Sequence, residues 1–256
     1  MSSVVLLCSS AMLNVFIGLP IASRGAAGCQ WIKRGKTVTF RNRVTEFYQT
    51  FSAPTSLSAD IELINPYEDS SRRRAIEEYY AKFFNDENVR VHILGINPSR
   101  MHPTATGVNY TDGYALENFC GIENSFSKSR ELTSDFFYQV VDAIGGAEEF
   151  FGRIFPWAMM PVTVTKKGNY ANYYGNDVVE DLKDLVRENV KWTSQLPSTG
   201  RLVILGSGEN QKFFENLPGS PFGYNDVRVV PHPRWVLQYN RANVDKFIGQ
   251  YVDALT

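Results

Sequence analysis

From residue 44 onward, short apolar runs alternate with amphipathic segments, and this alternation restricts the possible folds more than any other feature of the sequence. Strands that are joined through helices run parallel and need cover on both faces of their sheet. The pattern therefore predicts one α/β domain, a three-layer α/β/α sandwich with a short central parallel sheet of about four strands. The predicted strands span residues 89–94, 153–160, 202–205 and 227–230, and the predicted helices span 44–51, 70–84, 131–144, 177–196, 209–217 and 243–255, with Asp69 as the N-cap of the second helix.

The first 43 residues differ from the rest in composition. Residues 1–45 carry six basic side chains and no acidic one, and an apolar stretch at 4–18 precedes a small-residue segment around Arg24. This stretch resembles a secretory or organellar leader, although a signal peptide begins with basic residues and this stretch does not. Translation from a misplaced start codon fits as well. We expect residues 1–43 to be loosely ordered and residues 44–256 to form the domain.

Charge, cysteine spacing and hydropathy exclude several classes of protein. The net charge of -1 neither favours nor excludes nucleic acid as a partner, since binding depends on where the basic residues lie. Cys8, Cys29 and Cys120 lie far apart, so the sequence predicts free thiols and no metal site. The strand at 202–205 is followed by two glycines of a dinucleotide-binding motif without the third, so no cofactor is expected. No apolar run reaches the ~18–20 residues of a membrane span.

Two segments stand directly after predicted strands, where ligands gather in parallel sheets. The first is Gly-Ile-Asn-Pro-Ser-Arg at 95–100, and the second is Pro-His-Pro-Arg-Trp at 231–235. Gly95 lets the backbone approach a ligand closely, and Asn97 offers both a hydrogen-bond donor and an acceptor. His232 stands between two prolines, which restrict the position of its ring. An ordinary Asn-Pro turn and a structural histidine are the alternatives to a binding or catalytic site.

Taken together, the two segments resemble a known pair of motifs. GINPSR with ATGVNYTD (residues 95–112) and PHPRW (231–235) are similar to the signature motifs of the uracil-DNA glycosylase superfamily. Within it they resemble the single-strand-selective monofunctional uracil-DNA glycosylases, in a branch found mainly in bacteria, and the resemblance extends from residue 44 to the C-terminus. It implies a uracil-DNA glycosylase-like fold and a monofunctional DNA glycosylase. Such an enzyme hydrolyses the N-glycosidic bond of uracil, or of a related deaminated or oxidised base, in base excision repair.

The resemblance also implies a partner, a location and roles for individual residues. The partner is single- or double-stranded DNA with a damaged base, and the enzyme is a monomer in the bacterial cytoplasm, with the chromosome, that uses no cofactor and no membrane. Asn97 positions the water that attacks the sugar C1′, and His232 donates a hydrogen bond to O2 of the departing uracil. Tyr110 stacks on the base that is turned out of the helix. The other residues implied to contact the substrate are Gly95, Ile96, Gly107 and Asn172.

One position departs from the family pattern. Many members carry an Asn three residues before the Pro that follows the second strand, where it reads the uracil edge, and Ala158 stands there in this chain. Alanine forms no such hydrogen bonds, so the preferred base stays open, and Asn169 and Asn172 in the loop 166–174 are candidate substitutes. The departure also leaves an alternative function, a catalytically weak protein on the same fold that binds damaged bases or single-stranded DNA. A bifunctional lyase is disfavoured, because neither motif contains a lysine.

Basic and aromatic residues near the motifs are candidate contacts to DNA. Basic side chains that follow the strand ends can bind phosphates, and Trp235 can wedge the duplex open or stack on an exposed base. Ordinary surface positions, and a core position for Trp235, are the alternatives. The candidate phosphate contacts are Arg100, Arg234 and Arg241, with Lys166 and Lys167.

Overall fold

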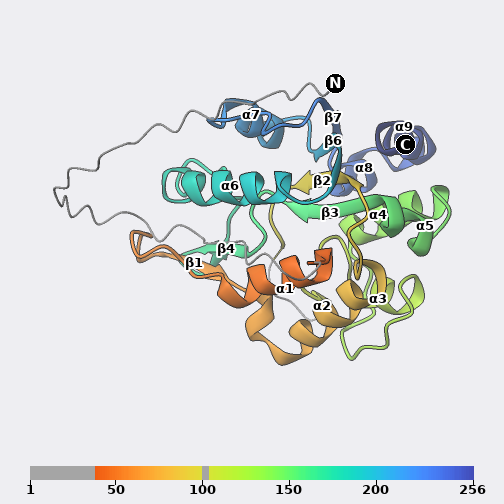
Figure 1. Cartoon of the computed structure of the whole chain (residues 1–256), viewed down its shortest axis with the longest axis horizontal. Helices are drawn as coiled ribbons and strands as arrows, with labels where there is room; N and C mark the ends of the chain where they lie inside the picture. The colour runs from red at the N-terminus through yellow and green to blue at the C-terminus, as the bar shows by residue number, and fades with distance from the viewer. Residues whose placement is uncertain (1–37, 100–103) are drawn as a thin grey trace, which may run out of the picture. The chain divides into compact units, whose positions relative to one another are not determined.

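Four parallel strands form the central sheet of the structure, a computed structural model that describes residues 38–99 and 104–256. The strands are β2 (Arg90–Gly95), β3 (Ile154–Ala158), β6 (Ser198–Leu205) and β7 (Asp226–Val230). They lie in the order β3-β2-β6-β7, and every neighbouring pair is parallel (Figure 1). The predicted sheet is therefore confirmed in strand number and direction. Each strand also overlaps the segment predicted for it.

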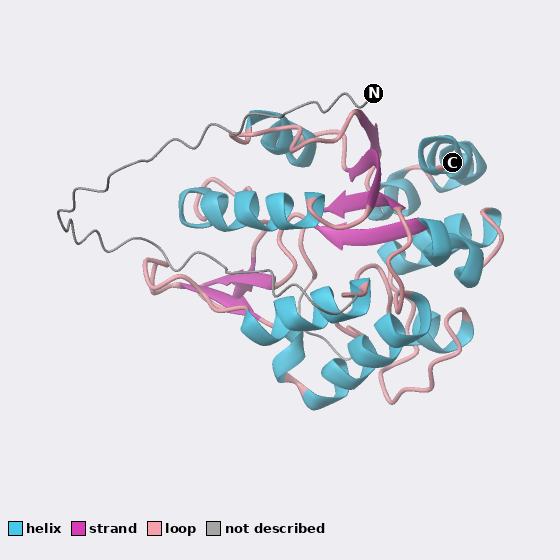
Figure 2. Ribbon diagram, in the orientation of Figure 1, coloured by secondary structure: helices cyan, strands magenta, loops and turns pink. Residues whose placement is uncertain are grey.

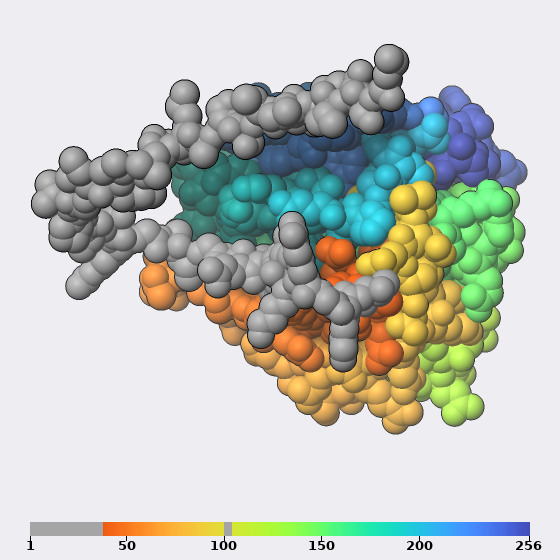
Figure 3. Space-filling model, in the orientation of Figure 1, coloured from red at the N-terminus to blue at the C-terminus, as the bar shows by residue number. Residues whose placement is uncertain are grey.

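Helices cover both faces of this sheet, and aromatic contacts show which helices share a face. Trp157 of β3 packs against Phe47 of α1 (Phe40–Thr50) and Trp192 of α6 (Val179–Ser194), with ring centroids 5.6 and 5.5 Å apart. Phe47 and Trp192 also contact each other, so α1 and α6 lie side by side over this face (Figure 3). Gly95 and Ala158 pair at the ends of β2 and β3 and face the opposite side, because side chains alternate along a strand.

The second layer of helices contains α4 (Leu132–Ala143), α8 (Pro233–Tyr239) and α9 (Val244–Leu255). Phe136 of α4 meets the ring of Tyr251 of α9 edge to face, at a centroid distance of 5.1 Å. The predicted three-layer arrangement is thus confirmed, as the ribbon diagram shows (Figure 2). The remaining helices are α2 (Ser70–Phe83), α3 (Gly113–Asn118), α5 (Ala147–Arg153), α7 (Glu209–Asn216) and the short 3-10 helices η1 (Pro66–Glu68) and η2 (Arg241–Asn243).

Local chemistry explains where the helices begin. Asp69 caps α2 as predicted, since its carboxylate accepts a hydrogen bond of 2.9 Å from the backbone N–H of Arg72. Helix α1 begins at Phe40, and both Phe40 and Val44 are fully buried. The predicted domain boundary at residue 44 therefore cuts through a helix that belongs to the core. Most of the segment 1–43, with Cys8 and Cys29, lies outside the described residues.

A second, smaller sheet was not predicted. It contains β1 (Ile61–Ile64), β4 (Thr163–Lys166) and β5 (Asn169–Tyr170), all antiparallel, in the order β1-β4-β5. Lys167 and Gly168 join β4 to β5 with φ angles of 49° and 74°, as in the two-residue turns of twisted hairpins. The predicted loop 166–174 therefore begins with a hairpin. The residues that follow the hairpin lie near the carboxyl end of β2, where Ala171 and Tyr173 form hydrogen bonds with Asn97.

Cys120 and His92 both lie in the interior. Cys120 is free and buried, and burial raises the pKa of its thiol to about 12. His92 of β2 is fully buried between Phe40 and Phe155. Its Nε2 donates to the Pro197 carbonyl at 3.2 Å, so its Nδ1 accepts from the Tyr224 hydroxyl at 2.7 Å. Burial lowers the pKa of His92 to about 4.

His92 should make folding stability depend on pH. Its folded pKa of about 4 lies below the unfolded value of about 6.5, so between these pH values the unfolded chain binds a proton that the folded chain does not. The stabilisation is present in full above pH ~6.5 and decreases as the pH falls toward 4, by on the order of 2–3 kcal/mol. Urea unfolding measures the free energy of unfolding at pH 7 and at pH 4.5. The decrease between the two pH values should be smaller for His92→Gln than for the wild type. Equal losses in both proteins would contradict this role.

No helix in the part of the chain that the structure describes is both long enough and apolar enough to cross a membrane. Within the same ranges, no group of three or more histidine, cysteine or acidic side chains is arranged to hold a metal ion.

Candidate active site

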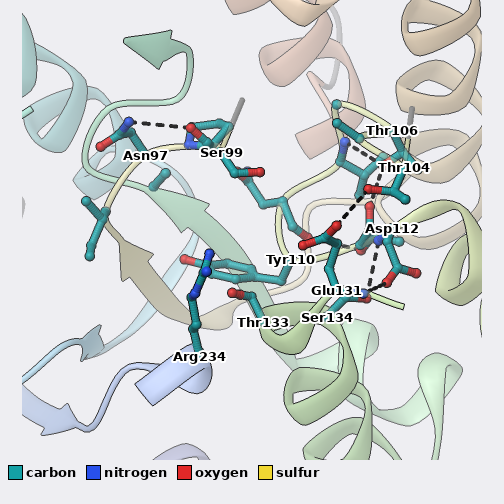
Figure 4. Close-up of a pocket in the computed structure, with 18 of the residues that line it drawn as sticks. Asn97, Ser99, Thr104, Thr106, Tyr110, Asp112, Glu131, Thr133, Ser134 and Arg234 are labelled. Carbon is teal, nitrogen blue, oxygen red and sulfur yellow. Dashed lines mark hydrogen bonds between the residues drawn. The ribbon is translucent and has the colours of Figure 1, made fainter. Parts of the chain in front are cut away.

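A cavity of about 600 Å³ opens at the carboxyl ends of the central strands. Ile96 and Asn97 follow β2, Ala158 ends β3, and His232 follows β7, so the parallel sheet brings distant parts of the chain to one place. Figure 4 shows Asn97, from the segment after β2, and Arg234, from the segment after β7, beside the cavity. The sequence-predicted residues that line it are Ile96, Asn97, Gly107, Tyr110, Asn172, His232 and Arg234.

Gly95 has a different place from the one expected. It is buried and is not among the residues that line the cavity. A Cβ atom at Gly95 would lie 1.9 Å from the hydroxyl oxygen of Tyr110, so only glycine lets the phenol end of the tyrosine approach the end of β2 this closely. Gly95 therefore makes room for a side chain of the protein and does not contact the cavity itself.

Tyr110 is held rigidly from two sides. One face of its ring stacks on Phe137 of α4, with centroids 4.8 Å apart and an angle of 20° between the planes. Its hydroxyl donates a hydrogen bond of 2.9 Å to the carbonyl of Trp157. The backbone of Tyr110 has φ 58°, a left-handed conformation that is uncommon for a bulky residue. Phe137 covers one face of the ring, so a planar ligand in the cavity could stack only on the other face.

The carboxamide of Asn97 has a defined orientation. Its Nδ2 donates to the carbonyl of Ala171 at 3.1 Å, and its Oδ1 accepts from the backbone N–H of Tyr173 at 3.2 Å. A carbonyl oxygen has two lone pairs, so Oδ1 retains one acceptor position. The backbone of the segment after β5 therefore determines the orientation of the Asn97 amide.

His232 caps helix α8, and this role determines its tautomer. Its Nδ1 accepts a hydrogen bond of 3.2 Å from the backbone N–H of Arg234, so the neutral ring carries its proton on Nε2. Burial, and then the positive charge of Arg234, lower the pKa of His232 to about 4. At neutral pH the ring is an uncharged donor with a fixed N–H.

Two asparagines that sequence analysis named as candidate substitutes lie in different places. Ala158 presents only a methyl group to the cavity, and its carbonyl accepts a hydrogen bond of 2.9 Å from the side chain of Asn189. Asn172 lines the same cavity. Asn169 is exposed in β5 and does not line it.

Sequence reasoning missed a polar wall on the far side of the cavity. Asp112 is central to it, since its carboxylate accepts from the backbone N–H groups of Ala115 at 2.8 Å and Glu131 at 2.7 Å. Thr133 and Ser134 belong to the start of α4, and no local motif marks them. The polar side chains of this wall are Thr104, Thr106, Asp112, Glu131, Thr133 and Ser134 (Figure 4).

The candidate DNA contacts are distributed around α8. Arg234 lines the cavity, and Trp235 and Tyr239 on the same helix are 44% and 68% exposed. Trp235 is thus a surface residue, with its ring edge to face against Phe247 at 5.8 Å. Arg241 is exposed in η2.

The other basic candidates are less available or not described. Lys166 lies within 4 Å of two carboxylates, those of Asp60 at 3.8 Å and Asp177 at 3.9 Å, which reduces its value as a phosphate contact. Lys167 forms the hairpin turn. Arg100 lies outside the described residues.

Comparisons with known proteins give a family and a similar solved structure. The model of the uracil DNA glycosylase superfamily matches residues 81–256, a range that contains both motif segments. A crystal structure of wild-type SMUG2 from Pedobacter heparinus is similar to this chain, with 30% sequence identity and a TM-score of 0.77. The similarity covers 84% of this chain and 96% of that one. No curated protein matches the chain.

Proposed function

This chain belongs to the uracil DNA glycosylase superfamily, and from that premise we propose that it removes uracil, or a related deaminated or oxidised base, from DNA by hydrolysis in base excision repair. The observation that carries the proposal is that Asn97 and His232, far apart in sequence, line one cavity in defined orientations. The enzyme acts as a monomer, without a cofactor, in the cytoplasm where a bacterial chromosome lies.

Hydrolysis of an N-glycosidic bond needs two groups from the protein. The bond between C1′ and the base nitrogen breaks and its electron pair leaves with the base, while the oxygen of water bonds to C1′ and a water proton is released. Asn97 orients the water through the free acceptor position of Oδ1, since an amide is too weak a base to remove a proton itself. His232 donates from Nε2 to the base oxygen on which negative charge develops.

The neutral state of His232 suits this role. A preorganised neutral donor stabilises the charge that builds on the leaving base without needing protonation at neutral pH. The departing base takes up a proton once it has left, so the reaction consumes one water and yields the free base and an abasic site. The DNA strand itself stays intact, because no lysine of either motif is present to form a covalent intermediate with the sugar.

The surface around α8 holds the DNA in this proposal. Arg234 reaches a phosphate at the mouth of the cavity, and Arg241 contacts the backbone further along. Trp235 stacks on an unpaired base next to the extruded nucleotide, because its ring is exposed and lies three residues beyond His232.

Ala158 supports a second candidate function. A cavity that presents only a methyl group at this position lacks one hydrogen-bonding contact, which is consistent with a protein that binds damaged bases or single-stranded DNA and cleaves them weakly. Such a protein would bind uracil-containing DNA without releasing uracil.

Cleavage of a labelled oligonucleotide with a single uracil separates the two functions. After incubation with the full chain and treatment with alkali, the proposed glycosylase leaves a shortened fragment from the uracil strand and none from a matched thymine strand. The same assay on single-stranded and duplex DNA measures strand preference. Binding of the uracil strand without any fragment would favour the second function.

Tyr110→Ala should weaken capture of the extruded base. Loss of the ring removes stacking worth about 1–3 kcal/mol, which corresponds to about 5- to 160-fold in affinity for DNA with a non-cleavable uracil nucleotide. Tyr110→Phe keeps the ring on Phe137 and loses only the bond to Trp157, so it should retain most of the affinity. If the two variants bind equally weakly, the hydroxyl matters and stacking does not.

A further inference from the structure

The cavity contains three carboxamides, and the structure distinguishes what each can do. Both Nδ2 and Oδ1 of Asn97 form hydrogen bonds with the backbone of the segment after β5. Oδ1 retains one acceptor position, which the proposed function assigns to water. The Nδ2 atom of Asn109 is closed to solvent and has no hydrogen-bond partner among the described residues, so a ligand in the cavity cannot reach it. Asn172 is half-buried and lines the cavity, and it is the remaining amide.

Two tyrosines hold the amide of Asn172. The hydroxyl of Tyr170 donates to its Oδ1 at 2.9 Å, and its Nδ2 donates to the hydroxyl of Tyr174 at 3.2 Å. Each contact uses one position, so one lone pair on the oxygen and one N–H on the nitrogen stay open. An adjacent acceptor and donor in one plane form the hydrogen-bonding pattern that reads the edge of a nucleobase.

Tyr170, whose hydroxyl holds Asn172, lines the same cavity as the two motif segments. Burial, and then the neighbouring Tyr174, raise the pKa of the Tyr170 hydroxyl to about 12, while Asn97 and Arg234 act in the opposite direction. Asn97, Asn172 and Arg234 line this cavity together with Tyr170. A base held between Asn97 and His232 would therefore occupy the cavity that Asn172 also lines.

The segment around Asn172 is anchored firmly enough to read a base. The side chain of Tyr173 is fully buried, and its hydroxyl donates to Oδ1 of Asn210 at 2.6 Å. Asn210 in turn donates to the carbonyl of Leu205 at the end of β6. The backbone N–H of Ala171 donates to Val164 of β4 at 3.0 Å. Residues 170–174 are thus fastened to both sheets.

We infer that Asn172 reads the hydrogen-bonding edge of the extruded base and selects bases that present a carbonyl beside a ring N–H, as uracil does. Its open N–H donates to the base carbonyl, and its open lone pair accepts from the ring N–H. Cytosine presents an amino group and an unprotonated ring nitrogen, the reverse pattern. This inference rests on the proposed function for the location of the base, but it concerns recognition and is independent of cleavage.

Binding of non-cleavable DNA tests the inference. Oligonucleotides with a single 2′-fluoro-2′-deoxyuridine or 2′-fluoro-2′-deoxycytidine resist hydrolysis, because the fluorine disfavours positive charge on the sugar. We expect the full-length wild type to bind the uridine strand more tightly, and Asn172→Ala to reduce the ratio of the two affinities by between about 5- and 100-fold. Asn169→Ala is the matched control, since Asn169 lies on the same hairpin outside the cavity, and it should leave the ratio unchanged.

The ratio of the affinities for the uridine and cytidine strands distinguishes recognition of the base by Asn172 from a purely structural role of this residue. If Asn172→Ala weakens both strands equally, or if the wild type does not distinguish them, the inference is wrong. Asn172→Gln, which keeps the amide and moves it by one methylene group, provides a second variant if Asn172→Ala unfolds, and it should also reduce the ratio. A wild type that distinguishes the strands through Asn172 but releases no uracil from normal DNA would contradict the proposed function and support this inference.

Discussion

Asn97→Ala should slow release of uracil by about 10²–10³-fold, measured in a single turnover, while DNA binding changes little. The reason is that the amide acts on the attacking water, whose position matters chiefly in the transition state. Loss of one preorganised hydrogen bond at such a point typically costs about this factor. The carboxamide of Asn97 is oriented by Ala171 and Tyr173, so in the wild type its free lone pair already points in one direction.

The matched control for this variant is Asn216→Ala. Asn216 carries an exposed amide at the end of α7 and does not line the cavity, so its removal should leave the rate unchanged. Affinity for a strand with 2′-fluoro-2′-deoxyuridine shows whether Asn97→Ala still binds DNA. A rate for Asn97→Ala close to that of the wild type would mean that the water is positioned by another group.

His232→Ala should have an effect of the same size, about 10²–10³-fold, because it removes the donor to the leaving base. The pH dependence identifies which form of the ring acts. With a pKa of about 4, His232 stays neutral and keeps its Nε2 proton across pH 5.5–8, so its contribution to the rate should be constant there. A charged imidazolium donor would instead lose its effect as the pH rises through about 6.5.

His232→Gln supplies the comparison, since its amide can still donate and does not titrate in this range. The wild-type and His232→Gln rates should therefore run parallel from pH 5.5 to pH 8, with the variant lower. If the wild-type rate falls relative to the variant as the pH rises through 6.5, the neutral-donor assignment is wrong.

Most of the main sheet could be predicted from sequence because β2, β3 and β6 contain apolar runs that are buried on both faces, whereas the edge strand β7 is only partly buried. The strand predicted at 89–94 forms at Arg90–Gly95, and the one at 227–230 forms at Asp226–Val230. The small sheet could not be predicted in the same way. β5 contains only Asn169 and Tyr170, and β1 pairs with β4 far along the chain, so neither has enough local periodicity to stand out.

Prediction of the site shows a similar limit. The motifs indicated Asn97 and His232 because each follows a strand of a parallel sheet. The helix that His232 caps was missed, although Pro233 at its first position is a recognised helix signal. The relation between Gly95 and Tyr110 depends on a side chain that folds back over β2, and the contribution of Thr133 depends on the packing of α4. Neither can be read from residue type and spacing.

The central claim is that the cavity between Asn97 and His232 hydrolyses the bond between uracil and deoxyribose. The most direct test measures free uracil and strand mass by mass spectrometry, after a single-uracil oligonucleotide is incubated with protein from a host that lacks its own uracil-DNA glycosylases. The wild type should release free uracil and leave an unbroken strand with one abasic site, and the double variant Asn97→Ala/His232→Ala should release almost none. Equal release by both proteins, or an unchanged strand with the wild type, would contradict the claim.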